Sequence, residues 1–209
     1  MLKTLPLLCL IATPALAQYQ PLLPRLYTVT GVAGNDTLNI RENPSANSAD
    51  IGDLQPGQNI EVLELSDDSA WALVSAMEST GWVSVRYLTL TRKADGTEPD
   101  AYSLPSEMSC FGTEPFWSLD LKTGESVSMS EMASGSTAPQ HYQILGMARP
   151  INVGPDYFGF MAGPYSGIIR REYCDDGMSD NQYGWSLNLL FPRAGGVAML
   201  SGCCSAVRP

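Results

Sequence analysis

The residues of this chain whose types and spacing could support chemistry are carboxylates grouped near a cysteine. Residues 174–180 read Cys-Asp-Asp-Gly-Met-Ser-Asp, and Glu114 begins a second distinctive run, Glu-Pro-Phe-Trp. Glu114 together with Asp175, Asp176 or Asp180 would supply the two carboxyl groups of a glycoside hydrolase, which lie roughly 5 to 9 Å apart. A carboxylate-dependent hydrolase is therefore one function that has to be weighed.

The same aspartates allow two interpretations without catalysis. Carboxylate oxygens are the ligands that calcium prefers, but residues 174–180 lack the glutamate that completes an EF-hand loop. In the other interpretation, Asp175 and Asp176 accept hydrogen bonds from backbone amides of a turn, and Gly177 supplies a positive φ. We favour the turn, because it explains every residue type in the run without a ligand, and we expect no metal.

Nothing else in the sequence forms a recognisable catalytic constellation. His141 is the one histidine, and its Pro-Gln-His-Tyr context indicates a loop that leads into a strand. Neither a Gly-x-Ser-x-Gly elbow nor a His-Glu-x-x-His motif occurs. A cysteine nucleophile requires a free thiol, which the cysteine count argues against. We therefore expect no catalytic residue, no cofactor, and a protein that acts by binding.

The cysteines indicate two disulfides. The chain has five cysteines, and Cys9 lies in an N-terminal segment that we expect to be removed. The remaining even number is typical of an oxidising compartment, where each bridge contributes about 2 to 4 kcal/mol. The absence of a Cys-x-x-Cys pair argues against zinc, and a bond between the two adjacent cysteines would strain the intervening peptide. Two pairings remain: Cys174 to Cys203 with Cys110 to Cys204, and Cys174 to Cys204 with Cys110 to Cys203.

The N-terminus has the features of a secretory signal peptide. Residues 1–17 contain one charge, an apolar run over residues 5–12 and an Ala-Leu-Ala cleavage signal. The apolar run is shorter than the ~20 residues of a spanning helix, so we expect no membrane span. We expect export to the periplasm of a Gram-negative bacterium, with residues 18–25 as an extended lead-in. The formal charge of −10 argues against nucleic acid as a partner.

Residues 26–90 alternate between apolar and polar side chains in short runs separated by turn signals. Such alternation is typical of half-buried strands, and several short strands in a small region indicate a barrel. The predicted strands span residues 27–30, 38–40, 59–62, 71–74 and 81–88.

Several runs within residues 26–90 resemble the bacterial SH3 domain in order and spacing. They are Leu-Asn-Ile-Arg-Glu-Asn-Pro-Ser at 38–45, Ile-Gly-Asp-Leu-Gln-Pro-Gly at 51–57, Trp71, Gly-Trp-Val at 81–83 and Tyr-Leu at 87–88. The resemblance implies an SH3-like barrel that binds cell-wall peptidoglycan or envelope peptides. It also implies a bend after Ser84 that presents Tyr87 to a ligand. The expected groove is formed by Trp71, Ser84 and Tyr87, flanked by Arg41 and Asn43.

The same region is strongly acidic. Within residues 26–90, Arg41 and Arg86 oppose nine carboxylates, which gives a net charge of −7. We interpret most of this charge as a solvated surface. If the charge acts in recognition, it would favour a cationic partner.

Residues 91–108 are polar, contain glycine and prolines, and read as an interdomain linker. Residues 109–209 then form a second β-domain, a barrel or a sandwich of seven or eight strands. Residues 132–140 are expected to form a loop. The predicted strands span residues 116–121, 126–129, 142–147, 157–161, 166–173, 183–191 and 197–203.

Two boxes in this second region resemble an uncharacterised family of bacterial exported proteins and lipoproteins. They are Gly-Thr-Glu-Pro-Phe-Trp at 112–117 and Cys-Asp-Asp-Gly-Met-Ser-Asp at 174–180, with a late Gly-Cys at 202–203. The resemblance implies no particular activity. It does imply a disulfide between Cys174 and Cys203, which leaves Cys110 to pair with Cys204. We expect Glu114 to be a buried carboxylate bonded to backbone or to Arg170 or Arg171. If the boxes meet in space, Glu114 and Asp180 would border one pocket. The candidate pocket residues are Glu114, Trp117, Asp176 and Asp180, although Trp117 also alternates with Leu119 as a core position.

The sequence therefore predicts an all-β protein with an SH3-like small barrel and a second, disulfide-bonded β-barrel or sandwich. We expect an exported envelope protein that binds peptidoglycan or envelope peptides without catalysis. An inhibitor of a cationic wall hydrolase such as lysozyme is one alternative, and the carboxylate-dependent hydrolase is the other. The sequence does not indicate an oligomeric state.

Overall fold

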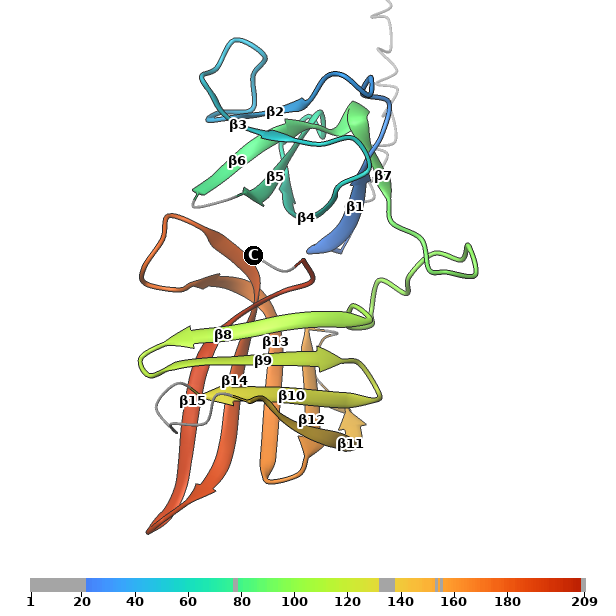
Figure 1. Ribbon diagram of the computed structural model, residues 1–209. Helices are drawn as coiled ribbons and strands as arrows, with labels where there is room; N and C mark the ends of the chain where they lie inside the picture. The colour runs from blue at the N-terminus through green and yellow to red at the C-terminus, as the bar shows by residue number, and fades with distance from the viewer. Residues whose placement is uncertain (1–21, 77–78, 132–137, 153, 155, 208–209) are drawn as a thin grey trace, which may run out of the picture.

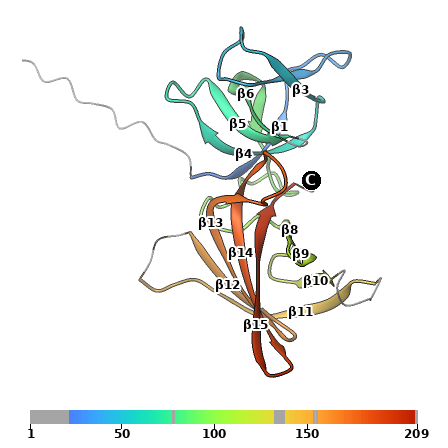
Figure 2. The same cartoon turned by 90° about the vertical axis from the view of Figure 1, so that its left-hand side faces the viewer.

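The computed structural model describes residues 22–76, 79–131, 138–152, 154 and 156–207. The predicted signal peptide, residues 18–21 of the lead-in and most of the predicted 132–140 loop lie outside the described residues. The predicted all-β class is confirmed, because the helical part of the described chain is one 3-10 turn, Val85–Tyr87. Figures 1 and 2 show the strands gathered into two bodies, one stacked on the other.

The first body is a seven-stranded sheet, called here the N-terminal sheet, with the order β3-β2-β6-β5-β4-β1-β7. The predicted strands are present, and the structure adds β3 and β7 and ends β6 at Ser84, as the implied bend requires. The bounds are β1 Arg25–Val29, β2 Leu38–Arg41, β3 Asp50–Leu54, β4 Asn59–Leu65, β5 Trp71–Ala76, β6 Ser79–Ser84 and β7 Leu88–Leu90.

Alternation explains the core of the N-terminal sheet. Apolar residues at every second position of β2, β5 and β6 point to one side, because successive strand residues face opposite sides of a sheet. Burying these aliphatic side chains contributes roughly 1.5 to 3 kcal/mol each. The buried members of this core are Val29, Leu38, Ile40, Leu54, Ile60, Val62, Ala72, Val74 and Val83.

The second body is a closed eight-stranded antiparallel barrel, called here the C-terminal barrel, which decides between the predicted barrel and sandwich. Its order is β10-β11-β12-β13-β14-β15-β8-β9, and closure leaves no unpaired strand edge. The bounds are β8 Glu107–Thr113, β9 Phe116–Lys122, β10 Ser126–Glu131, β11 Gln140–Ala148, β12 Tyr157–Ala162, β13 Tyr165–Asp175, β14 Gln182–Arg193 and β15 Gly196–Ser205.

Two features of the C-terminal barrel differ from the sequence prediction. Strand β8 begins at Glu107, inside the predicted linker, and was missed because the inward residues Met108 and Cys110 alternate with polar ones over a short run. His141 lies within β11 rather than in a loop. The predicted β9–β10 hairpin is confirmed, with Leu121 opposite Val127. Trp117 and Leu119 are buried in the core, as their alternation predicted.

The two disulfides join Cys110 to Cys204 and Cys174 to Cys203, so the pairing implied by the resemblance is confirmed. Adjacent residues on β15 point to opposite faces of the barrel wall. Cys204 faces the interior, opposite Cys110 of β8, and both belong to the core. Cys203 faces outward and reaches Cys174 at the end of β13. Alternation therefore gives two neighbouring cysteines two different partners.

The two bodies are packed together at a junction rather than tethered. Residues of β4 are buried on both faces, since Ile60 and Val62 enter the sheet core while Glu61 contacts the C-terminal barrel. A Cβ at Gly184 of β14 would lie 2.5 Å from Pro24, so this close approach requires glycine. The predicted linker is also docked, because Leu104 is buried in the barrel core.

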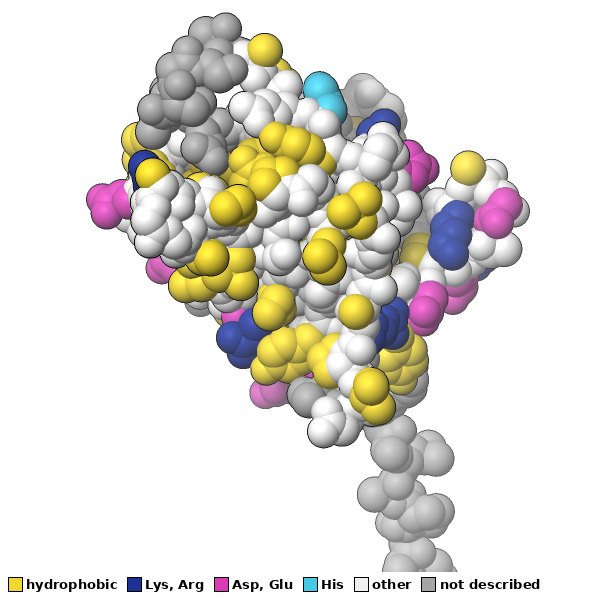
Figure 3. Space-filling model, turned by 90° about the horizontal axis from the view of Figure 1, so that it is seen from below, with side chains coloured by type: hydrophobic (Ala, Val, Ile, Leu, Met, Phe, Trp, Pro, Cys, Tyr) yellow, Lys and Arg dark blue, Asp and Glu magenta, His cyan; other side chains and the backbone are white. Residues whose placement is uncertain are grey.

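The outer wall of the C-terminal barrel carries apolar side chains at the end remote from the N-terminal sheet, seen from below in Figure 3. Leu190 and Met199 are direct cross-strand partners there. Neighbouring strands add further exposed apolar residues to the same wall, which are not part of the core. They are Leu145, Met147, Met161, Ile168 and Val197.

Candidate functional site

The groove predicted on the N-terminal sheet is present as a cavity of about 430 Å³. Arg41, Trp71, Ser84 and Tyr87 all line it. Trp71 and Ser84 are cross-strand partners on β5 and β6. Tyr87 reaches the same cavity because the chain leaves the strand at Ser84 and turns through the 3-10 segment. Continued alternation would have placed Tyr87 on the buried side with Val83.

Asn43 does not line this groove. It is exposed in the loop after β2, where its backbone N–H and its side-chain amide both donate to Ser48 Oγ. These bonds hold the loop, in which Ala46 does line the groove. The predicted place of Asn43 at the flank of the groove stays a prediction.

The electrostatics of the groove differ from those of the surface around it. Arg41 and Arg86 are the only cations within residues 26–90, and both line the groove, whereas Asp36 is the one carboxylate of its described lining. The Arg86 guanidinium lies 5.7 Å from the Tyr87 ring centre. Arg41 donates to the Ser48 carbonyl at 3.1 Å and lies 3.8 Å from Asp50. An acidic sheet thus presents a locally positive, aromatic groove.

Arg86 and Asp36 were not predicted as groove residues. The signal for Arg86 was present in the composition, because a cation is rare in this part of the chain. Strict strand alternation also places Arg86 on the face of Ser84, a predicted groove residue, and places Tyr87 on the opposite face. The 3-10 turn brings both side chains to one groove.

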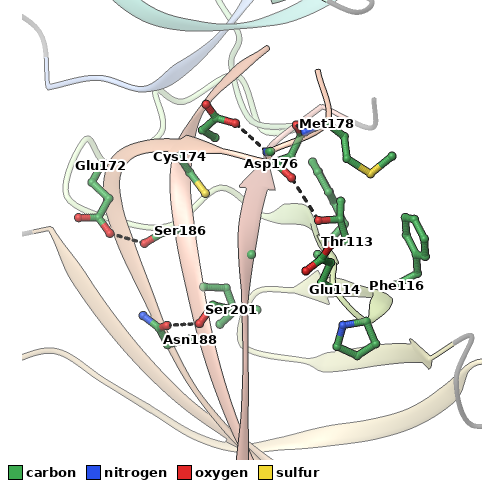
Figure 4. Close-up of a pocket in the computed structure, with 17 residues that line it drawn as sticks. Thr113, Glu114, Phe116, Glu172, Cys174, Asp176, Met178, Ser186, Asn188 and Ser201 are labelled. Carbon is green, nitrogen blue, oxygen red and sulfur yellow. Dashed lines mark hydrogen bonds between the residues drawn. The ribbon is translucent and has the colours of Figure 1, made fainter. Parts of the chain in front are cut away.

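The two boxes of the C-terminal barrel do meet in space. Thr113 Oγ1 donates to the Asp176 carbonyl at 3.2 Å, and Glu114 and Asp176 line a groove of about 1380 Å³. Figure 4 shows the two segments facing each other across it. Trp117 lies in the core instead, and Asp180 faces the N-terminal sheet, where its backbone pairs with Ser79. Of the four predicted pocket residues, Glu114 and Asp176 therefore line the groove.

Glu114 is exposed rather than buried, and neither predicted arginine reaches it. Arg170 forms an ion pair with Glu172 at 2.8 Å, and Arg171 lies 3.7 Å from Asp156. Glu114 lies in the tight connection between β8 and β9, which carries its side chain to the rim. The expectation of a buried carboxylate at this position is wrong.

The turn interpretation of residues 174–180 is confirmed. Asp176 accepts bonds from Met178 N and Ser179 N at 2.9 Å, from Ser179 Oγ at 3.0 Å and from Tyr183 Oη at 3.4 Å. Asp175 accepts from Gly177 N at 2.7 Å, and Gly177 has a φ of 70°. Partial burial would raise the pKa of Asp176, but these hydrogen bonds outweigh it and lower the pKa below its usual value. Asp176 is therefore an ionised carboxylate used to build the turn.

The barrel groove is acidic and partly apolar. The carboxylates that line it are Glu114, Glu172, Asp175 and Asp176, and its described lining contains no lysine, arginine or histidine. Phe116 and Met178 line the groove with exposed fractions of 50% and 68%. Its floor is the outer wall of the barrel, where Ser201 Oγ donates to Asn188 Oδ1 at 2.8 Å. Such a surface suits a cationic or hydroxyl-rich ligand.

A search of the described residues for metal sites finds no group of three or more histidine, cysteine or acidic side chains arranged to hold an ion. A similar search finds no helix with the length and hydropathy needed to cross a membrane.

Comparison with known proteins identifies one part of the chain. The family model of the bacterial SH3 domain matches residues 36–89, which run from just before β2 to β7 and include both arginines of the N-terminal groove. No curated protein and no solved structure matches the chain. The family resemblance of the two boxes in the C-terminal barrel therefore stays a prediction.

Proposed function

We propose that this protein is a periplasmic, non-catalytic binding protein whose N-terminal groove engages peptidoglycan or a peptide of an envelope protein. The observation that carries the proposal is the convergence of Arg41 and Arg86 with Trp71 and Tyr87 on one groove. This groove lies within the segment matched by the bacterial SH3 family. The two disulfides agree with an oxidising compartment outside the cytoplasm.

The chemistry of the groove suits an anionic peptide. Guanidinium groups recognise carboxylates through charge-assisted hydrogen bonds, and aromatic faces pack against peptide and sugar backbones. Peptidoglycan stem peptides carry free carboxylates beside apolar alanine side chains, so Arg41 and Arg86 would bind the carboxylates while Trp71 and Tyr87 contact the rest. The acidic surface around the groove would repel ligands that dock elsewhere on the sheet.

Co-sedimentation with purified sacculi tests the proposal. The chain without residues 1–17 should pellet, and Trp71→Ala combined with Tyr87→Ala should leave it in the supernatant. Trp82→Ala is the matched control, because Trp82 is a half-buried tryptophan of the same sheet that does not line the groove. Pelleting of the double variant at wild-type levels would show that the groove is not the binding site.

The acidic groove of the C-terminal barrel favours a second candidate function, inhibition of a cationic wall hydrolase such as lysozyme. Its four carboxylates and its exposed Phe116 and Met178 would receive a basic loop with an apolar residue. Inhibition should weaken as salt screens the charges. Glu114→Lys should abolish it, while Asp67→Lys, a reversal at an exposed residue outside the groove, should not. Unchanged lysozyme activity in the presence of excess protein would exclude this candidate.

The hydrolase alternative is weaker than either binding function. Asp176 is held ionised by its hydrogen bonds and is not available as a general acid. Turnover of muropeptides by the purified chain, abolished by Glu114→Gln, would establish catalysis and overturn the non-catalytic proposal.

A further inference from the structure

A cavity of about 330 Å³ lies at the junction between the two bodies. It is enclosed by the start of β1, by the segment between β7 and β8, and by β13 and β14 of the C-terminal barrel. Figure 1 shows that segment passing down one side of the junction. Much of the wall is apolar, including Leu26, Leu90 and Leu104, with Trp185 behind them. Its volume is at the lower end of the range for small-molecule sites.

The cavity concentrates positive charge in an acidic protein. Arg25, Arg92, Lys93 and Arg171 line it, against Asp100 as the one lining carboxylate. The whole chain has 12 lysines and arginines and a formal charge of −10, so four cations around one small cavity are a large share. Arg92 pairs with Glu98 and Arg171 with Asp156, but cations still outnumber carboxylates among the lining residues. An excess of one sign of charge beside low-dielectric walls raises the local concentration of the opposite ion.

The buried side chain of Arg171 lines the cavity and has N–H donors that make no hydrogen bond among the described residues. Its side chain is 5% exposed and lies over Trp185 at 4.7 Å. It donates to the Leu22 carbonyl at 3.4 Å and to the Ala101 carbonyl at 2.9 Å, and its Nε, 3.7 Å from Asp156, has no hydrogen-bond partner among the described residues. A guanidinium has five N–H donors, and two of them bond to these carbonyls, so donors remain for another acceptor.

The other three cations divide into two that fold the segment and one at the rim. Arg25 donates to the Pro99 carbonyl at 3.0 Å, and Arg92 forms an ion pair with Glu98 at 3.0 Å. The first contact joins the segment to β1, and the second holds a turn within the segment. Lys93 is exposed and belongs to none of the ion pairs found within 4.0 Å among the described residues.

We propose that the junction cavity binds a small carboxylate that carries an apolar chain or ring. Arg171 and Lys93 bind the carboxylate, and Leu26, Leu90 and Leu104 contact the apolar part. The charge of the lining selects against amines, and its apolar wall selects against small hydrophilic anions such as phosphate. This site is separate from the groove of Trp71 and Tyr87 and does not depend on the function proposed for that groove.

Calorimetric titration of the chain without residues 1–17 with octanoate tests the proposal. Octanol and octylamine have the same chain length, so they isolate the contribution of the charge. Octanoate should bind with one site per chain, octanol at least about tenfold more weakly, and octylamine not at all. Equal affinity for octanol and octanoate, or no binding of octanoate at millimolar concentration, would overturn the proposal.

Charge reversal locates the site. Lys93→Glu is on an exposed residue and should weaken octanoate binding about three- to tenfold without changing the fold. Lys122→Glu is the matched control, because Lys122 is exposed and lies outside the cavity. Trp71→Ala with Tyr87→Ala should bind octanoate as the wild type does. Octanoate affinity that is unchanged by Lys93→Glu, or lost equally in Lys122→Glu, would show that the ligand binds elsewhere.

Discussion

The junction and the turn at residues 174–180 each contain a carboxylate that accepts several hydrogen bonds, yet their pKa values are displaced in opposite directions. Glu61 accepts from Trp185 Nε1 at 2.9 Å, Ser205 Oγ at 3.1 Å and Ala206 N at 3.3 Å, all donated by the C-terminal half of the chain. Asp176 accepts three such bonds from its own turn and a fourth from Tyr183 of β14. Accepting several hydrogen bonds therefore does not by itself decide whether the pKa of a carboxylate is raised or lowered.

Solvent decides it. Burial raises the pKa of Glu61 to about 7, although its hydrogen bonds and the charge of Arg171 act in the opposite direction. Asp176 remains partly hydrated, so the same kind of hydrogen bond lowers its pKa. Removing a carboxylate from water disfavours the charged form more than three hydrogen bonds favour it. The junction thus contains a carboxylate that titrates near neutral pH, and the turn contains one that stays charged.

The largest expected loss of stability comes from removing the disulfide that holds the turn at residues 174–180. Cys174→Ala with Cys203→Ala opens a bridge with a sequence separation of 29, which should lower the free energy of unfolding by about 3 to 4 kcal/mol. Denaturant unfolding of the double variant measures this loss. A loss below about 1 kcal/mol would mean that Asp176 and its neighbours hold the turn without the disulfide.

Glu61→Ala removes the acceptor from three donors at the junction. A buried donor left unpaired costs about 1 to 3 kcal/mol, and we expect a total loss of about 3 kcal/mol because Ser205 can rotate to another acceptor. Glu61→Gln is the control. Its carbonyl can accept from Trp185 and Ala206 while its amide donates to Ser205, so it should retain most of the stability. Equal losses in the two variants would contradict the role given to hydrogen bonding.

The contributions of Glu61 and Asp176 to the free energy of unfolding should change with pH in opposite directions. The pKa of Glu61 rises from 4.5 to about 7 on folding, so the folded state binds more protons between these values. The contribution of Glu61 to stability is complete below about pH 4.5 and is lost as the pH rises to about 7, on the order of 2 to 3 kcal/mol. Unfolding free energies of the wild type relative to Glu61→Gln, measured from pH 4.5 to 8, should show this decline. A flat difference would place the pKa of Glu61 near its ordinary value.

Asp176→Ala should have the smallest effect, about 1 kcal/mol, because water can replace part of its hydrogen bonding. The contribution of Asp176 to stability changes with pH in the opposite direction to that of Glu61. A carboxylate whose pKa is lowered on folding stabilises the fold at pH values above the usual pKa of 3.8. This stabilisation is lost as the pH falls below that value. The difference between wild type and Asp176→Ala, followed by thermal unfolding, should therefore shrink in acid. A difference that grows in acid would contradict the assigned direction.

The sequence predicted the features that depend on neighbouring residues. The two-residue period placed Trp117 and Leu119 in the core, and the Asp-Asp-Gly composition predicted the turn with Gly177 at positive φ. The SH3 resemblance brought Arg41, Trp71, Ser84 and Tyr87 to one groove. Asn43 does not line this groove, because loop direction depends on bonds, here to Ser48, that no local pattern reveals.

Glu61 shows what the sequence could not provide. It was counted among nine carboxylates of a solvated acidic surface, and its alternation with Ile60 and Val62 indicated an outward side chain. It does point out of the sheet, but a second body covers that face and leaves Glu61 4% exposed. Only the tertiary structure could show this, because burial of an outward-facing residue depends on what packs against it.

The sequence by itself determined most of the strands, the all-β class and the four cysteines available for two bridges. These follow from alternation, turn chemistry and spacing, which act over a few residues. The tertiary structure decided the closure of the barrel, the separate faces of Cys203 and Cys204, the exposure of Glu114 and the packing of the junction. Those properties depend on contacts between residues far apart in the chain, whose geometry is fixed only when both bodies are folded and docked.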